Sequence, residues 1–329
     1  MARVTIVMYH YVRDLEHSAY PDIKGLRLDL FKEQLAYIVK YYTVIRMEEL
    51  IGALKRGLPI PENAALLTFD DGYLDHYTNV FPILNGLGIQ GSFFPPVKAV
   101  MEHKVLDVNK IHFVLATAPD KAALAKELMD LIDEFRKEYN LRQNKDYYLE
   151  FAVKGRFDDA DVAFIKTMLQ MALPEKVRSA IVDTLFRKYV AKSEEVFSRD
   201  LYMSLDQIRC MQRNGMYIGA HGYAHNWLST LNRAEQESEI DRSLDFLRLI
   251  GGNTNEWAFN YPYGDYNHSV TELLEHKGCS LALTTDVDIA NISFHNRLLL
   301  PRLDTNNLPK GSNAPPNEWT LKATEPLSP

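Results

Sequence analysis

The chain has 329 residues, of which 46% are hydrophobic and 25% are charged, and its formal net charge at pH 7 is −7. This length and composition are typical of one large α/β domain, or two smaller ones, with a full hydrophobic core. The acidic balance and the lack of a dense Lys/Arg block argue against nucleic acid or an anionic membrane surface as a partner. Cys210 and Cys279 form no CxxC pattern, so neither a disulfide framework nor a thiolate metal site is expected.

No export signal or transmembrane segment is expected. Residues 1–10 contain one basic residue, too few apolar residues for the hydrophobic region of a signal peptide, and no cleavage site. The uncharged stretch 77–97 is interrupted by prolines, glycines and amide side chains, which fits helix, turn and strand better than a membrane span. We therefore expect a cytoplasmic protein, although a trimmed form of an exported protein would look the same.

Strand and helix patterns alternate in the first third of the chain. Residues 3–9 form an apolar strand, and apolar residues then recur at helical spacing over residues 28–42. The next expected elements are strand 43–46, helix 48–56 with Gly57 as its C-cap, strand 64–69, helix 75–87 and strand 89–94. This alternation argues for parallel strand pairing and an α/β fold.

The alternation stops over residues 98–203, which are charge-rich and helical. The clearest helices span residues 122–139, 159–171 and 175–189. We interpret this stretch as an insertion that forms a helical lobe or lid, and the alternative that it covers one edge of the sheet stays open.

Alternation resumes at residue 204, where Ser204 and Gln207 form a capping box for a helix that ends near Asn214. The strands expected after it are 216–221, 257–261, 280–284 and 298–303, with helices 233–250 and 270–277 among them. About seven strand–helix units predict a closed or partly open barrel built from residues 1–97 and 204–308, with active residues at the carboxyl ends of strands. The tail, residues 309–329, is expected to be poorly ordered.

Two adjacent acids, Asp70 and Asp71, follow the buried strand 64–69 and precede Gly72. Buried carboxylates are costly unless something pairs with them. Consecutive strand side chains point to opposite faces, so the two acids should have different partners and different roles. The alternative is an ordinary Asp-Gly turn after a core strand.

Two further strands also end in polar residues. His221 and His225 are four residues apart, so on a helical turn both rings would share one face. Two imidazoles and one carboxylate leave coordination positions open, as hydrolytic metal sites require, although a histidine pair at this spacing is often incidental. Pro262–Gly264 shapes a tight loop, which by itself indicates only a turn.

In this order the three stretches resemble the motifs of the polysaccharide deacetylase family, the NodB-homology carbohydrate esterases. The family's Thr-Phe-Asp-Asp-Gly motif stands at residues 68–72, its His-x-x-x-His motif at 221–225, and its Pro-Tyr-Gly loop at 262–264. The resemblance covers about residues 1–97 and 204–305. It implies an α/β fold, a deformed (β/α) barrel of about seven strands that carries the helical insertion.

The resemblance also implies an activity: metal-dependent N-deacetylation of N-acetylated amino sugars in a polysaccharide or its precursor. It implies a divalent metal, usually zinc, bound by Asp71, His221 and His225. Asp70, which is then not a ligand, would be the general base. The backbone N–H of Tyr263 would stabilise the oxyanion.

Two departures from the family pattern matter. The arginine that often opens the third motif is absent from residues 259–261; Arg302 could supply that charge from another strand, or could be a surface or salt-bridge arginine. The Leu-x-His motif that commonly supplies the general acid is also absent. The Tyr-His pair that ends in His10 resembles the poly-N-acetylglucosamine deacetylase branch, in which an N-terminal histidine is the acid. We therefore prefer His10 to His295, although His10 could instead be hydrogen-bonded in a strand-end turn. Five other histidines are expected to be solvated or packing residues: His76, His103, His112, His268 and His276.

Three other functions fit parts of the pattern. A catalytically silent carbohydrate-binding module on the same fold is disfavoured by the intact acids and histidines of the first two motifs. An aspartyl-phosphate phosphatase generally needs its acids two residues apart, and here they are adjacent. A non-haem iron oxygenase could use two histidines and a carboxylate, but it would leave Asp70 and the Pro-Tyr-Gly loop unexplained. The pattern does not specify an oligomeric state.

Overall fold

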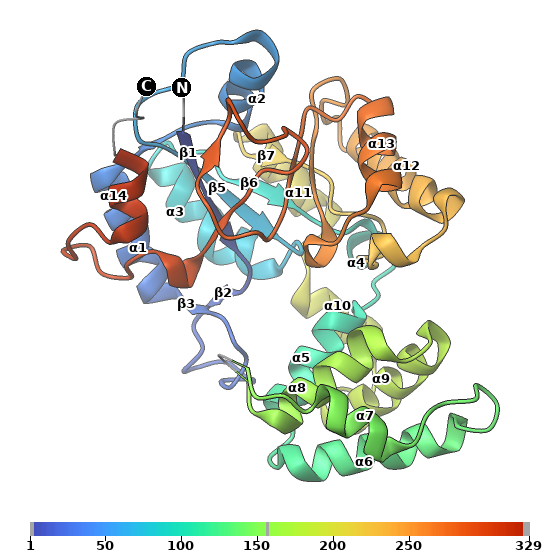
Figure 1. The fold of residues 1–329 in the computed structure, drawn as a ribbon. Coiled ribbons are helices and arrows are strands. Elements are labelled where there is room, and N and C mark those ends of the chain that lie inside the picture. Colours follow the sequence, from blue (N-terminus) through green and yellow to red (C-terminus); the bar gives the residue numbers. More distant parts are fainter. Residues whose placement is uncertain (1–2, 156–157, 325–329) are drawn as a thin grey trace. The chain divides into compact units, whose positions relative to one another are not determined.

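The computed structural model describes residues 3–155 and 158–324 (Figure 1). It divides into two compact units, which we call the sheet unit and the helical unit. The sheet unit comprises Met1–Asp14, Gly25–His103 and Arg199–Pro329, and the helical unit comprises Leu15–Lys24 and Lys104–Ser198. All three sequence motifs belong to the sheet unit. No helix in the described ranges is both long and apolar enough to cross a bilayer.

A seven-stranded sheet forms the centre of the sheet unit. Its main path runs β10-β1-β5-β6-β7, with β11 paired to β1 and β4 paired to β5. Every pairing in it is parallel except β1 with β10. The strands are β1 (Arg3–Tyr9), β4 (Thr43–Val44), β5 (Ala64–Asp70), β6 (Ser92–Phe94), β7 (Tyr217–Ile218), β10 (Ala290–Asn291) and β11 (Leu303–Asp304).

Two shorter parallel ladders accompany this sheet. β8 (Ala258–Asn260) pairs with β9 (Leu281–Leu283), and β2 (Val12–Arg13) pairs with β3 (Leu26–Arg27). Isolated parallel bridges join Ala220 to Phe259 and Leu283 to Leu300. The predicted α/β class with parallel strands is therefore confirmed, and parallel pairing brings the carboxyl ends of β1, β5 and β6 to one edge.

The two faces of β5 serve different purposes. Phe69 stacks between Tyr9 and Phe93, with ring centroids 4.9 and 4.7 Å away, and all three rings are fully buried. Asp70 follows on the opposite face because strand side chains alternate. The pleat thus buries a continuous aromatic layer on one side and places a carboxylate on the other.

Helices cover the sheet unit. They are α1 (Leu28–Tyr41), α2 (Met47–Arg56), α3 (Phe81–Gly86), α4 (Val97–Met101), α11 (Leu205–Arg213), α12 (Arg233–Leu249), α13 (His268–His276) and α14 (Glu318–Thr324). Two predicted helix ends are confirmed: Gly57 is left-handed after α2, and Ser204 with Gln207 forms the capping box of α11. Such ends satisfy backbone groups that a helix leaves unpaired.

The expectation of a poorly ordered tail is wrong for residues 309–324, which include the helix α14, and residues 325–329 lie outside the described residues. Thr320 is 1% exposed, and its hydroxyl hydrogen-bonds the Tyr37 and Tyr42 hydroxyls at 2.8 and 3.0 Å. α14 therefore lies beside α1, as Figure 1 shows. This anchor depends on partners 283 and 278 positions away in the chain, which the local Pro- and Asn-rich composition does not reveal.

Several strands are shorter than expected. The segment 298–303 was predicted as a strand, but only Leu303–Asp304 is one. Pro301 has no N–H to donate to a ladder, which explains the interruption. The expected strand 89–94 is also shorter and spans only Ser92–Phe94. The Gly91 N–H donates to the Met216 sulfur instead of to a strand partner.

The helical unit contains six α-helices in its described residues or at its edge: α5 (Asp107–Thr117), α6 (Lys121–Phe135), α7 (Asn144–Phe151), α8 (Ala160–Thr167), α9 (Glu175–Tyr189) and α10 (Glu194–Leu201). Its limits lie inside the expected insertion 98–203, and it gains the segment Leu15–Lys24. That segment joins through Tyr20, whose ring packs edge-on against Phe113 and Phe197.

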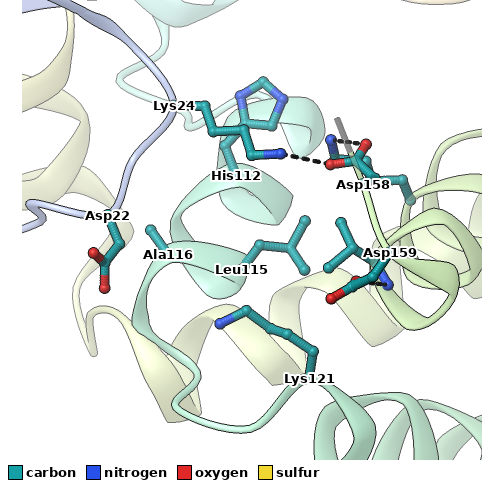
Figure 2. A pocket seen from close by; sticks show the side chains of 10 residues that line it. Asp22, Lys24, His112, Leu115, Ala116, Lys121, Asp158 and Asp159 are labelled. Atoms are coloured by element: carbon teal, nitrogen blue, oxygen red, sulfur yellow. Dashed lines mark hydrogen bonds and ion pairs between the residues drawn. The ribbon is translucent and has the colours of Figure 1, made fainter. Parts of the chain in front are cut away.

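A cavity of about 370 Å³ lies within the helical unit (Figure 2). Its apolar lining includes Leu115 and Val162. Lys24 and Lys166 both bond the Asp158 carboxylate at 2.6 Å, so two of the cations lining it share one anion. This compensation lowers the pKa of Asp158: burial raises it, but the two lysines outweigh burial.

The packing of α1 on the sheet yields a stability prediction. Phe31 is fully buried and its ring meets those of Tyr9 and Phe69 edge-on. We expect Phe31→Ala to lower the free energy of unfolding by about 3–5 kcal/mol, through lost burial and the cavity left behind. Val39→Ala on the same helix is the control, because Val39 is 50% exposed; we expect a change within about 0.5 kcal/mol. Urea unfolding followed by circular dichroism measures both, and equal losses would contradict the packing described.

Candidate active site

The turn after β5 directs the two acids to different partners. Asp71 has a φ of 71° and Gly72 a φ of 65°, so both adopt the left-handed conformation. A Cβ at Gly72 would lie 2.7 Å from the Pro95 Cβ, so only glycine fits there. The Asp-Gly turn is thus a constrained structure rather than an ordinary surface turn, and both acids are buried.

Asp70 is held by an arginine and an amide. Arg302 Nη1 lies 2.8 Å from Oδ2 and donates to Oδ1 at 3.0 Å, and Asn260 Nδ2 donates to Oδ1 at 2.5 Å. Burial alone would raise the pKa of Asp70, but the charges of Arg302, His221 and His10 outweigh it and keep the pKa below its ordinary value. Asp70 is therefore a carboxylate at neutral pH.

Arg302 is itself fixed from two directions. Its Nε donates to the Thr284 carbonyl at 2.8 Å and its Nη1 to the Thr68 hydroxyl at 3.3 Å. Its side chain has no exposed surface. The structure therefore places Arg302 against Asp70, as the first sequence alternative expects, and excludes a surface arginine. Asn260 stands within the third motif where an arginine is absent, and its role was missed because an amide carries no charge signal.

Asp71, His221 and His225 converge on one point. Their candidate ligand atoms all lie within 4.8 Å of one another. The two histidine Nε2 atoms are 3.5 and 3.4 Å from Asp71 Oδ1. That oxygen is buried and has no hydrogen-bond partner in the described part of the chain. A buried unpartnered carboxylate oxygen facing two imidazole nitrogens fits a divalent cation, so these residues could hold a metal.

Burial and the two acids set the protonation of the three candidate ligands. Burial lowers the pKa of His221, but the hydrogen bond and charge of Asp71 and the charge of Asp70 outweigh it and raise that pKa. His221 Nδ1 lies 2.8 Å from the Asn260 carbonyl, which can only accept, so Nδ1 carries the proton and Nε2 is left as the ligand. Burial lowers the pKa of His225 to about 3, which leaves its ring neutral at pH 7. For Asp71, burial raises the pKa, but the interactions with His221, His225 and His10 bring it well below its ordinary value.

Tyr73 also contacts Asp71, and sequence reasoning gave it no role. Its hydroxyl donates to Asp71 Oδ2 at 2.5 Å, and its ring stacks on Tyr11 at 4.0 Å between centroids. Burial and the Asp71 charge raise the pKa of Tyr73 well above its ordinary value, so it stays a donor. Tyr73 therefore occupies one carboxylate oxygen and leaves the other to a metal.

His10 and His295 lie at opposite ends of β1. His10 directly follows β1, and Tyr9 pairs with Phe69 in the parallel β1–β5 ladder, so His10 lies at the same end of the sheet as Asp70. His295 Nδ1 accepts from the N–H of Asn291, whose strand partner is Arg3. Seven extended residues from Arg3 to His10 span roughly 23 Å, so only His10 lies near the site.

His76 is packed rather than solvated. It is fully buried, and its Nε2 lies 2.8 Å from the His10 carbonyl oxygen. Burial lowers the pKa of His76 to about 4, so its ring is neutral at pH 7. This contact fixes the backbone at His10, because it joins the end of β1 to the chain that follows Asp71.

Tyr263 lies against the histidine loop. Its ring stacks on Trp227 at 4.3 Å between centroids and 8° between planes, and meets the His225 ring at 4.6 Å and 66°. Its φ of 58° is left-handed. Ser229 donates from its N–H and its hydroxyl to Asp265, both at 2.7 Å, which ties the second motif to the third. The role of the Tyr263 N–H as an oxyanion donor stays a prediction.

Comparisons with known proteins bear on the family and the fold of the chain. The family model described as polysaccharide deacetylase matches residues 157–282, which include the second and third motifs. The poly-beta-1,6-N-acetyl-D-glucosamine N-deacetylases of Escherichia coli K12 and O157:H7 are each 37% identical over 79 residues, or 24% of this chain. The chain spans only 12% of the length of these relatives.

Solved structures give the fold over nearly the whole chain. The Streptococcus pyogenes deacetylase PplD is 19% identical with a TM-score of 0.58, and each chain is 99% covered. IcaB from Ammonifex degensii is 18% identical with a TM-score of 0.55, covering 99% of this chain and 98% of its own. A de-N-acetylase from Aggregatibacter actinomycetemcomitans is 16% identical with a TM-score of 0.53, covering 98% and 100%.

These likenesses carry different weight. At such low identities the solved structures establish the fold, whereas the family model and the Escherichia coli relatives match the sequence itself. The predicted resemblance to the polysaccharide deacetylase family is confirmed over residues 157–282, which match the model of that family.

Proposed function

We propose that this protein is a metal-dependent N-deacetylase that removes acetyl groups from N-acetylated amino sugars of a polysaccharide or its precursor. One observation carries the proposal: the Asp71, His221 and His225 cluster lies beside a separate carboxylate, Asp70, that Arg302 keeps ionised. Hydrolytic metal sites need both a ligand set with open positions and a free base. The Escherichia coli relatives are named for poly-beta-1,6-N-acetyl-D-glucosamine, which makes that polymer the first substrate to test.

The metal proposed is zinc, held by Asp71, His221 and His225. Two imidazoles and a carboxylate are a ligand set that zinc accepts. Bound there, the ion would polarise the acetamide carbonyl and lower the pKa of a water. Asp71 Oδ1 is buried and has no hydrogen-bond partner among the described residues. A silent carbohydrate-binding module would have no need of such an oxygen.

The other residues move or hold protons. Asp70 accepts a proton from the attacking water, and the bonds from Arg302 and Asn260 fix which way its carboxylate faces. Tyr263 offers its backbone N–H to the oxygen that becomes negative. His10 donates a proton to the nitrogen as the C–N bond breaks, because an amine does not leave as an anion.

A deformed barrel is the arrangement that we infer for the strands of the sheet unit. The bridge of Ala220 to Phe259 extends the order β5-β6-β7 to β8 and β9, and the bridge of Leu283 to Leu300 leads towards β11 and back to β1. These single bridges support the inference, since ring closure needs each strand to have two neighbours.

The cytoplasmic location expected from the sequence stays a prediction.

The activity is tested by acetate release from a panel of N-acetylated glycans, with poly-N-acetylglucosamine first. We expect zinc-loaded protein to release acetate, and protein stripped with a chelator to lose this activity and regain it when zinc is restored. Metal-dependent binding of a glycan without release of acetate would support the silent module instead.

The division between the two acids predicts different losses. We expect Asp70→Asn to keep one equivalent of zinc by elemental analysis while its rate falls on the order of a hundredfold or more. Asp71→Asn should lose the zinc. If Asp70→Asn released the metal and Asp71→Asn kept it, the roles of the two acids would be reversed.

The Arg302–Asp70 pair predicts a shift in the pH dependence. The Arg302 charge lowers the pKa of Asp70, so removing it should raise that pKa. A base works only when ionised, so the acid limb of the kcat/KM profile should move to higher pH in Arg302→Met. Arg302→Lys keeps the charge and should move the limb less, and Arg233→Met, at a half-exposed arginine, should not move it. An unmoved acid limb in folded Arg302→Met would contradict Asp70 as the base.

The general acid is tested at both candidate histidines. We expect His10→Ala to slow turnover and to remove the alkaline limb of the pH–rate profile, because that limb reports loss of the donated proton. Zinc content should not change. His295→Ala, at the opposite end of β1, should keep the wild-type profile; full activity in His10→Ala and loss in His295→Ala would reverse the assignment.

A further inference from the structure

The loop that carries both histidines has an unusual backbone. Gly222 has a φ of 72° and His225 a φ of 58°. The left-handed conformation costs a histidine free energy, and such residues persist only where their surroundings fix them. The loop belongs to no strand or helix. Contacts from outside the loop must therefore hold the two imidazoles at their separation.

Glu239 of α12 supplies the densest of these contacts. Its Oε2 accepts from the backbone N–H groups of Tyr223 and Ala224 at 2.8 and 3.0 Å, and its Oε1 accepts from Asn226 Nδ2 at 3.2 Å. The side chain is nearly buried, at 7% exposure for the residue. Successive backbone N–H groups in a turn form a concavity that binds anions, and here an internal carboxylate fills it.

The opposite side of the loop is held by α4. The N–H of Lys98 donates to the Tyr223 carbonyl at 2.8 Å, and the N–H of Val97 donates to the Gly222 carbonyl at 3.4 Å. The segment between Gly222 and His225 is thus hydrogen-bonded on both sides: its N–H groups donate to Glu239, and its carbonyls accept from the first residues of α4. A rotation of this segment would break both sets of bonds. These bonds therefore fix the direction in which the His225 side chain points from the backbone.

Space around the carboxylate is also matched to the loop. A Cβ built at Gly222 would lie 3.1 Å from Glu239 Oε2, closer than most real contacts. The Arg242 guanidinium lies 3.1 Å from the centre of the Tyr223 ring. Burial raises the pKa of Glu239, and the hydrogen bonds from the loop and the Arg242 charge oppose that rise. The carboxylate therefore has three hydrogen-bond donors and a cation around it.

We propose that Glu239 is a positioning residue that fixes the His221–His225 loop and thereby sets the affinity of the site for its metal. This rests on the metal site of the proposed function, but not on the substrate or on any acetyl transfer to water. A carboxylate accepts every bond that the loop offers. A glutamine would turn an NH₂ donor towards one of these donors, so it could not satisfy all three.

The test compares Glu239→Gln with Glu237→Gln on the same helix. Glu237 makes a surface ion pair with Lys277 instead of bonds to the loop. Its variant has the same charge change as Glu239→Gln and is therefore a matched control. Zinc affinity is measured by competition with a chromophoric chelator, and the cobalt-loaded proteins are compared by visible absorption. We expect Glu239→Gln to bind zinc about 10- to 100-fold more weakly, the usual effect of losing a group that orients a ligand. We also expect an altered cobalt spectrum, with both readouts unchanged in Glu237→Gln.

The outcomes separate this proposal from the function. Wild-type zinc affinity and cobalt spectrum in Glu239→Gln, with only a lower melting temperature, would overturn the positioning role. If Glu239→Gln does not fold, Asn226→Ala carries the test, because it removes one bond to the carboxylate; an unchanged affinity and spectrum there would overturn the proposal too. If wild-type protein bound zinc but released no acetate, the deacetylase function would fail while the positioning result stood. If wild-type protein bound neither zinc nor cobalt, both would fail.

Discussion

Two adjacent buried carboxylates at the end of β5 are the constraint on which the site depends. Asp70 and Asp71 are 1% and 4% exposed, and two unpaired charges so close together in the interior would be prohibitively costly. The fold answers each acid separately. Arg302 and Asn260 arrive from the C-terminal third of the chain for Asp70, and Tyr73 and the two histidines turn to Asp71. The two buried charges thus bring segments far apart in the sequence together at the end of β5.

Backbone strain gathers at the same place. Among the described residues six that are not glycine have a positive φ, and three of them are Asp71, His225 and Tyr263. One such residue comes from each motif. Left-handed residues of this kind are kept only when their surroundings determine them completely. The packing of Gly72 on Pro95 does so for Asp71 in the first motif, and we propose that Glu239 does so for His225 in the second motif.

The sequence reaches the motif residues because each signal is local. Asp70, Asp71, His221 and His225 follow apolar strand patterns within a few positions, and Arg302 was found by asking what charge Asp70 needs. Asn260, Tyr73 and Glu239 were missed, since each acts through an uncharged or distant contact that no periodicity marks. Strand lengths were overestimated where Pro301 and Gly91 interrupt pairing, and α14 was missed because its anchor on Tyr37 is tertiary.

The charges explain why a base and a metal site can lie side by side. Histidines that bind a metal are neutral, and with both rings neutral the buried group holds two carboxylates against one guanidinium, which is an excess of negative charge. Low dielectric makes that excess expensive, and a divalent ion would reverse its sign. A negative charge that develops on a substrate oxygen would then be neutralised within the site. Without Arg302 the pKa of Asp70 would be higher, so Asp70 would be an ionised base only at higher pH.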